Sequence, residues 1–218
     1  MSLNFSNKVW SDKKVILGEQ ELDTQKPIRV VVGFHGAEST PENMLVHCSK
    51  LNIPNCLLVF PEGPIDADNG LWSWWKDGPK QKETVQSFVT VTDSIFDQAK
   101  EYVTKKHENA SVDFFAWGFS QGAAAVLVAV LFGSQTISKA ASVCGFLPEL
   151  PSEAPKPTSP VPILGIFGAN DEVVPSFLAE HALEEINQIG HQAQIKETPQ
   201  GHEVTSENLS EINQYFGN

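Results

Sequence analysis

Cysteine is scarce in this sequence, which contains only Cys48, Cys56 and Cys144. Three scattered cysteines without a C-x-x-C pair are too few for a disulfide framework. The first ten residues also lack the basic segment followed by an apolar stretch that a secretory signal requires. Both absences favour a reducing compartment, so we expect a cytoplasmic protein.

Long apolar runs and clusters of basic residues are missing as well. The apolar stretch 123–132 is about half the length of a membrane-spanning helix, which needs roughly 20 residues. The formal net charge is -12, and no cluster of Lys and Arg offsets it locally. Such a surface repels phosphate backbones and anionic lipid headgroups. We therefore expect no nucleic-acid partner and no stable membrane insertion.

What is present is an ordinary globular composition, with 41% hydrophobic and 19% charged residues. The 218 residues suffice for one compact domain, and we predict a single domain over residues 1–218. A proline-rich stretch, 147–162, is interpreted as a surface excursion between two strands because the same pattern continues on both sides. Formation of a homodimer is left open by the sequence.

Apolar runs typical of buried strands alternate with segments of helical spacing. The predicted strands are 29–34, 56–60, 112–117, 140–144, 163–167 and 193–196. Helices are expected from Pro41, with Thr40 as N-cap, over 84–108, over 121–131, from Pro175, and at the C-terminus. The alternation predicts an α/β fold with a mostly parallel sheet and helices on both faces. Ligands bind beyond the carboxyl ends of such strands.

The sequence Gly118-Phe119-Ser120-Gln121-Gly122 is a G-x-S-x-G pattern lying between a predicted strand and a predicted helix. In that context the pattern is typical of a sharp turn that lifts a nucleophilic serine over the N-terminus of the following helix. The alternative is a glycine-rich turn in which the serine is incidental. The position between strand and helix favours function, and we predict Ser120 as the nucleophile.

A serine hydroxyl needs a base, and histidine has a suitable pKa. His181 falls inside a predicted helix and His191 precedes the last predicted strand, whereas His202 follows that strand at the carboxyl edge. We therefore predict His202 as the base, with a solvated loop histidine as the alternative. Asp171 and Glu172 both follow the strand 163–167. We prefer Asp171 because its shorter side chain loses less entropy when it orients the base.

Acyl transfer also needs two donors for the developing oxyanion. The backbone N–H groups of Gln121 and of Ala37 have the expected positions, and His35 is interpreted as a structural histidine bracing this loop.

Three tryptophans, Trp72, Trp74 and Trp75, either form a satellite core or line an apolar groove for the substrate. His202-Glu203 opens like the zinc-binding H-E-x-x-H motif, but position 206 is serine, so that interpretation fails. We expect no metal and no cofactor.

Together these segments resemble the phospholipase/carboxylesterase family of the α/β-hydrolase superfamily, which includes acyl-protein thioesterases and lysophospholipases. The matching segments, in family order, are 34–36, 118–122, 171–175 and 201–202. The resemblance implies a Ser120–Asp171–His202 triad, metal-independent hydrolysis and a small enzyme with little lid. The sequence departs from the family pattern at residues 37–39 and at Lys76, and both departures concern how the substrate fits the site.

The predicted function is that of a serine carboxylesterase acting on small to medium-chain carboxylic esters through an acyl-enzyme on Ser120. Alternatives within enzymes are an acyl-protein thioesterase, a lysophospholipase, or a peptidase or amidase. An alternative from another class is a non-catalytic ligand-binding protein on a hydrolase scaffold.

Overall fold

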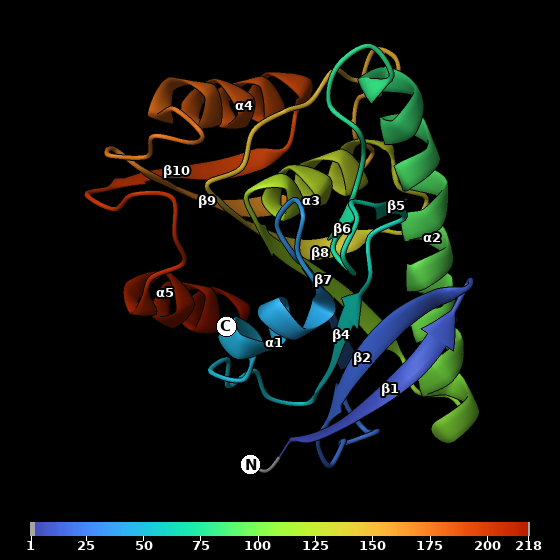
Figure 1. Ribbon diagram of the computed structural model, residues 1–218. Coiled ribbons are helices and arrows are strands. Elements are labelled where there is room, and N and C mark those ends of the chain that lie inside the picture. The colour runs from blue at the N-terminus through green and yellow to red at the C-terminus, as the bar shows by residue number, and fades with distance from the viewer. Residues whose placement is uncertain (1–2, 218) are drawn as a thin grey trace.

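An eight-stranded sheet forms the centre of the computed structural model, which describes residues 3–217 (Figure 1). The strands of this sheet run in the order β1 (Asn4–Trp10), β2 (Lys13–Glu19), β4 (Cys56–Pro61), β3 (Ile28–Phe34), β7 (Val112–Phe119), β8 (Ile137–Val143), β9 (Pro162–Gly168) and β10 (Gln192–Thr198). The helices are α1 (Pro41–Cys48), α2 (Gln81–Lys106), α3 (Gln121–Phe132), α4 (Ser176–Ile189) and α5 (Ser206–Gly217). A two-stranded hairpin, β5 (Ile65–Asp66) and β6 (Trp72–Ser73), lies between β4 and α2 in the chain.

In the sheet order from β4 to β10 all neighbouring strands are parallel, whereas β1 pairs with β2, and β2 pairs with β4, in the antiparallel sense. The prediction of a mostly parallel sheet is therefore confirmed. The β1–β2 hairpin was not predicted. Its turn residues Ser11 and Asp12 both have positive φ, 48° and 60°, as a two-residue hairpin turn requires, but neither is the glycine or asparagine that usually signals such a turn.

Helices cover both faces of the sheet. Buried side chains of α2, α3 and α4 belong to one hydrophobic cluster, and those of α1 and α5 belong to the other. Along β3, Val30 and Val32 point into the first cluster while Val31 points into the second. A strand buried on both faces needs apolar residues at every position, which explains the continuous apolar runs in the sequence.

The predicted helix starts and strand positions agree closely with the structure. Thr40 caps α1 by accepting a hydrogen bond from the Asn43 N–H at 3.3 Å, and Pro41 occupies the first turn. Strand β8 begins at Ile137, three residues before the predicted start at residue 140. The sequence pattern places the start too late because the half-buried polar residues Ser138 and Lys139 interrupt the apolar run. Lys139 can lie there because its ammonium group donates to the Tyr215 carbonyl at 2.9 Å.

The proline-rich stretch forms a loop between β8 and β9 without helix or strand, as expected of a surface excursion. Partly buried Leu147, Leu150 and Ala154 anchor it against the first cluster. Over residues 3–217, no helix combines the length and the apolar character that crossing a membrane requires.

Candidate active site

Ser120 occupies the turn between the end of β7 and the start of α3. Its backbone has φ 55° and ψ -124°, a strained conformation for a non-glycine residue. The flanking glycines permit this turn. A Cβ on Gly118 would lie 2.2 Å from the Gly122 carbonyl oxygen, and one on Gly122 would lie 2.1 Å from the Phe34 carbonyl oxygen. The turn therefore has the geometry of a nucleophile elbow, with the serine at the carboxyl edge of the sheet.

Three side chains far apart in the sequence form a continuous hydrogen-bonded chain at this edge. The Ser120 Oγ lies 2.9 Å from His202 Nε2, and His202 Nδ1 lies 2.8 Å from Asp171 Oδ2. Asp171 follows β9 and His202 follows β10, so parallel neighbouring strands deliver both to the same place. This is the arrangement in which a histidine accepts a serine proton while a carboxylate holds the correct tautomer.

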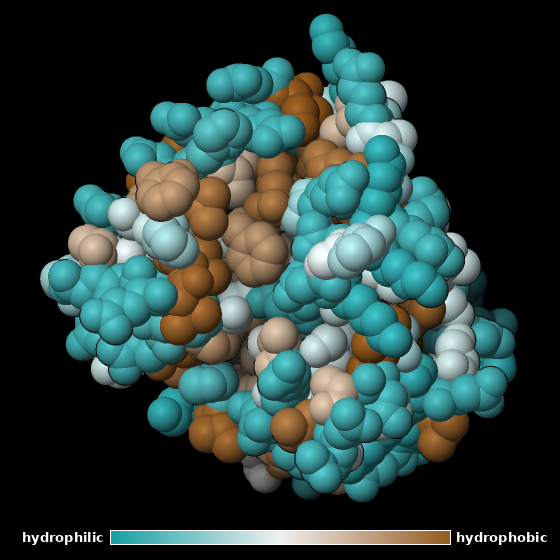
Figure 2. Space-filling model, turned by 45° about the horizontal axis from the view of Figure 1, so that its top comes forward, coloured by the Kyte–Doolittle hydropathy of each residue, from teal (hydrophilic) through white to brown (hydrophobic). Residues whose placement is uncertain are grey.

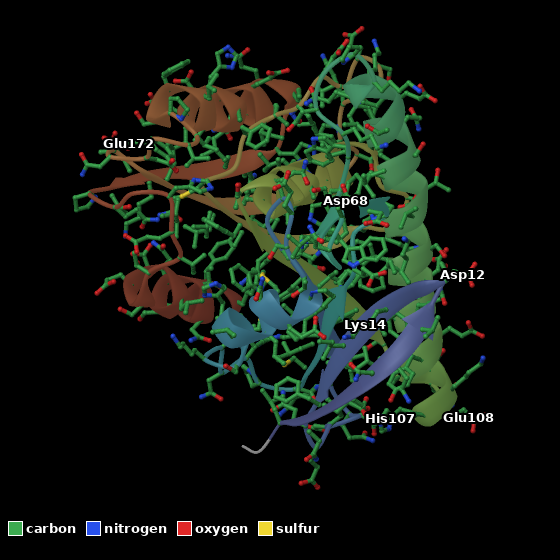
Figure 3. All side chains as sticks on the ribbon, in the orientation of Figure 1. Asp12, Lys14, Asp68, His107, Glu108 and Glu172 are labelled. Carbon is green, nitrogen blue, oxygen red and sulfur yellow. The ribbon has the colours of Figure 1, made fainter. Side chains whose placement is uncertain are left out.

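The Asp171 carboxylate is almost completely buried, with a side-chain exposure of 1%. Its other oxygen accepts hydrogen bonds from the Val173 and Val174 N–H groups at 2.9 and 2.8 Å. Burial raises the pKa of Asp171, but the hydrogen bonds from His202 and the two amides outweigh it and lower the pKa below its ordinary value. The neighbouring Glu172 points outward from the loop into solvent (Figure 3).

The segment after β3, which includes Gly36 and Ala37, passes close to Ser120. A Cβ on Gly36 would lie 3.7 Å from Ser120 Cβ, so the chain passes directly beside the serine. Among the described residues, the N–H groups of Ala37 and Gln121 have no backbone partner, which leaves both free to stabilise an oxyanion.

His35 is buried, and burial lowers its pKa to about 4, so the ring is neutral at pH 7.

A cavity of about 390 Å³ opens over the serine and the histidine. One part of its wall is polar and includes Ser39, Asn43 and His47, while Met44, Phe119 and Val173 supply an apolar part. Val173 is 67% exposed, and Phe177 and Leu178 on the adjacent first turn of α4 are also exposed. In Figure 2 hydrophobic side chains gather in a band across the face brought forward. The cavity therefore suits a substrate with a polar and an apolar part.

The sequence profile of the family described as Phospholipase/Carboxylesterase matches residues 20–217. The chain belongs to this family. It is a hydrolase with the α/β-hydrolase fold. No curated protein sequence matches it.

Three solved structures show how closely the fold of this hydrolase is shared. A carboxylesterase from Bacillus cereus has 16% identity and a TM-score of 0.76, with 94% of each chain covered. SOBER1 from Arabidopsis thaliana has 22% identity and a TM-score of 0.73, with 88% of this chain and 98% of that chain covered. A carboxylesterase from Mesorhizobium loti has 16% identity and a TM-score of 0.73, covering 96% of this chain and 97% of that chain. At such identities the likeness concerns the fold.

The tryptophans do not lie together in the cavity of the hydrolase. Trp74 and Trp75 are each 1% exposed and pack in the first hydrophobic cluster, with ring centroids 5.8 and 5.6 Å from that of Phe88. Their burial corrects the expectation that both line a substrate groove, because α2 covers them and leaves no surface for a ligand. Trp72 is partly exposed, with the Lys13 ammonium 4.4 Å from its ring centroid, and its contact with substrate stays a prediction.

A buried polar network that the sequence does not predict holds the loop around His202. The Gln200 side chain donates to the Glu203 carbonyl at 2.8 Å, which closes the turn around His202. Its oxygen accepts from the Thr198 hydroxyl at 2.9 Å and from the Asn208 amide at 2.8 Å. Gln200 and Asn208 are 7% and 1% exposed. Isolated polar residues have no periodic pattern, so only their pairing in the fold reveals them.

Cys144 lies next to Asp171 and His202. One possible ligand atom from each of the three side chains lies within 4.8 Å of the other two. Burial and the neighbouring Asp171 raise the pKa of the Cys144 thiol to about 12, which opposes the thiolate that a nucleophile or a metal ligand needs. The Asp171 and His202 atoms also already share a hydrogen bond. These residues therefore fit a serine site better than a metal site or a cysteine nucleophile.

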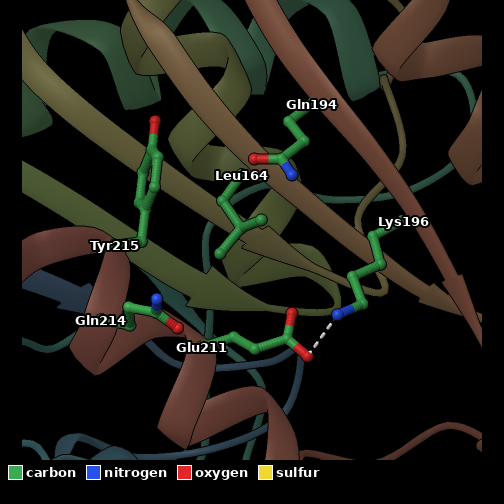
Figure 4. Close-up of a pocket in the computed structure, with 6 residues that line it drawn as sticks. All are labelled: Leu164, Gln194, Lys196, Glu211, Gln214 and Tyr215. Carbon is green, nitrogen blue, oxygen red and sulfur yellow. Dashed lines mark hydrogen bonds and ion pairs between the residues drawn. The ribbon is translucent and has the colours of Figure 1, made fainter.

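A second cavity of about 280 Å³ lies between β9, β10 and α5 (Figure 4). An ion pair between Lys196 Nζ and Glu211 Oε1, 2.6 Å apart, crosses part of its wall. None of the predicted site residues lines it. This cavity therefore holds none of the residues that the sequence predicts to act in catalysis.

Proposed function

We propose that this hydrolase is a serine carboxylesterase that cleaves small to medium-chain carboxylic esters through an acyl-enzyme on Ser120. The observation that carries the proposal is the hydrogen-bonded chain from Ser120 Oγ to His202 Nε2 and from His202 Nδ1 to Asp171 Oδ2. A neutral imidazole placed in this way can take the serine proton as the oxygen attacks.

In the first half-reaction Ser120 Oγ bonds to the ester carbonyl carbon while His202 Nε2 takes the hydroxyl proton. The tetrahedral oxyanion accepts hydrogen bonds from the Ala37 and Gln121 N–H groups. When the intermediate collapses, the bond to the alcohol oxygen breaks and His202 returns the proton to that oxygen. Asp171 remains ionised and stabilises the imidazolium, in keeping with the hydrogen bonds that lower its pKa.

In the second half-reaction a water molecule attacks the acyl carbonyl and gives its proton to His202. Collapse of the second tetrahedral intermediate releases the carboxylic acid, and the proton returns to Ser120. No step requires a cofactor. The cavity volume of about 390 Å³ and its mixed wall support a small or medium acyl group beside the serine.

The decisive experiment is labelling of the protein with a fluorophosphonate probe, combined with hydrolysis of p-nitrophenyl esters of rising chain length. We expect labelling and turnover in the native protein and neither in Ser120→Ala, since the nucleophile is missing. A matched control is Ser134→Ala, at an exposed serine outside the cavity. An unlabelled native protein that still binds esters would instead support the non-catalytic alternative.

An acyl-protein thioesterase or lysophospholipase would use the same acyl-enzyme chemistry. We expect the ester with the highest kcat/KM to be turned over faster than its matched thioester and than a lysolipid of the same chain length. The opposite order would replace the proposed substrate class while leaving the roles of Ser120, Asp171 and His202 in place.

We also propose that the hydrolase works in a reducing cytoplasm. Cys48, Cys56 and Cys144 are buried and unpaired, and burial raises the pKa of all three thiols. Such thiols pack as small apolar core residues, and none of them forms a disulfide that would need an oxidising compartment. Cell fractionation with an antibody to the protein tests this location.

A further inference from the structure

Trp74 contacts both chain segments that carry the two backbone N–H groups at the nucleophile. Its indole Nε1 donates a hydrogen bond to the His35 carbonyl at 2.7 Å, in the segment after β3. Its backbone N–H donates to the side-chain oxygen of Gln121 at 2.8 Å, at the start of α3. Since Ala37 lies two residues beyond His35, one residue spans the two halves of the proposed oxyanion hole.

The Gln121 side chain completes this connection. Its Nε2 donates to the Trp75 carbonyl at 3.2 Å, so both ends of the amide are bound to the tryptophan segment. Gln121 is 3% exposed, and a buried amide with both ends paired is held in one orientation. Gln121, which carries one of the two proposed oxyanion donors on its backbone, is thus fixed through its own side chain.

The other half is fixed through His35. The His35 ring lies against the Trp74 ring, with centroids 4.7 Å apart. Its Nε2 accepts from the Gly63 N–H at 3.2 Å, and its Nδ1 is 2.7 Å from the Gly36 carbonyl oxygen, to which it donates. Since its pKa of about 4 keeps the ring neutral, these two roles hold throughout the neutral pH range.

We infer that Trp74 is a positioning residue for the oxyanion hole, tying the Ala37 and Gln121 donors to one another. The inference rests on the proposed function. Oxyanion donors act only when they lie 2.7–3.1 Å from the charged oxygen, so a small shift of either segment weakens both bonds. These bonds strengthen in the transition state, and their loss lowers kcat more than it changes KM.

The test compares Trp74→Phe with Trp75→Phe. The two tryptophans are equally buried and both pack on Phe88, but the Trp75 indole N–H has no hydrogen-bond partner among the described residues. The two changes therefore remove the same ring volume, and only the first removes a bond to the oxyanion segment. We expect kcat to fall about 10- to 100-fold in Trp74→Phe and less than about threefold in Trp75→Phe, with KM within about twofold in both.

A second readout is inhibition by an alkyl trifluoromethyl ketone. Ser120 Oγ adds to the ketone carbonyl, the serine proton passes to His202, and the carbonyl oxygen becomes an oxyanion. The inhibition constant should rise in Trp74→Phe by the same factor as kcat/KM falls. Melting temperatures of the two variants show whether both fold.

Equal losses in the two variants, or a ketone inhibition constant that does not change in Trp74→Phe, would overturn the positioning role while leaving the esterase intact. A native protein that is neither labelled at Ser120 nor active on esters would overturn the proposed function and this inference with it. A selective loss in Trp74→Phe, seen in kcat and in the ketone inhibition constant, would support both.

Discussion

Asp171 shows how a single carboxylate becomes specialised by its surroundings. One carboxylate oxygen faces His202 Nδ1, and the other accepts hydrogen bonds from two backbone N–H groups. Because these donors favour the charged form, the carboxylate remains ionised even though its side chain is 1% exposed. A buried, oriented anion beside the imidazole is what the proposed proton transfer requires.

Replacement of Asp171 by Asn should lower kcat about 10³- to 10⁴-fold, because an amide cannot hold the imidazole in the tautomer that accepts the serine proton. Glu172→Gln is the matched control, since it removes an adjacent, exposed carboxylate. Steady-state kinetics on a p-nitrophenyl ester measure both. A comparable loss in the two variants would argue against Asp171 as the specific partner of His202.

His35 makes a prediction about stability rather than catalysis. Its pKa is lowered from 6.5 to about 4 in the folded protein by burial, so between these values the unfolded chain binds a proton that the folded chain does not. Stability therefore falls as pH drops from 6.5 to 4, by about 3 kcal/mol from this group. Urea unfolding at several pH values should show a flatter dependence in His35→Gln than in the native protein.

His181→Gln is the matched control for that measurement, because the His181 side chain is 75% exposed. It should keep the pH dependence of the native protein. An unchanged slope in His35→Gln would mean that His35 titrates normally in the folded state.

At the scale of elements, the nucleophile turn depends on glycine at a specific place. A Cβ on Gly122 would meet the carbonyl oxygens of Phe34 and His35 at 2.1 and 2.3 Å, and backbone atoms cannot move aside independently. Gly122→Ala must therefore push the start of α3 away from the end of β3. The displaced elements are the ones that carry the two proposed oxyanion donors.

We expect Gly122→Ala to lose about 1–3 kcal/mol of unfolding free energy and at least about 100-fold in kcat. Gly217→Ala, at the end of α5 where an added Cβ meets nothing within 4 Å, should change neither. Chemical denaturation and ester kinetics measure the two effects. Native activity in Gly122→Ala would show that the close approach of these elements is not needed.

The elements that could be predicted from sequence are those with continuous apolar runs or helical spacing, such as β3 and α2. The β1 strand escaped prediction because most of its side chains are exposed at the edge of the sheet. The tryptophan segment was ambiguous because a cluster of aromatic residues does not reveal which side another helix covers. Gln200 and Asn208 left no signal, since their roles depend on partners brought together only by the fold.

For the whole molecule, the sheet is the shared wall of both hydrophobic clusters, and every strand from β1 to β10 in the large sheet pairs with a neighbour. The side chains of the proposed triad follow the ends of β7, β9 and β10, so the proposed site exists only when these strands are assembled. A fold in which the two clusters share one wall should lose both together. We therefore propose that residues 1–218 form a single cooperative domain.

Tryptophan positions allow a direct test of that proposal. Trp117 lies in the cluster shared with α1 and α5, whereas Trp10, Trp74 and Trp75 lie in the other. In Trp117→Phe the fluorescence of buried tryptophans comes only from Trp10, Trp74 and Trp75 in the first cluster. Far-ultraviolet circular dichroism, in contrast, reports all helices and strands. We expect the two signals to give one coincident urea transition, because neither cluster can persist once the shared sheet separates. Two separated transitions would mean that the faces unfold independently, and the single-domain proposal would fail.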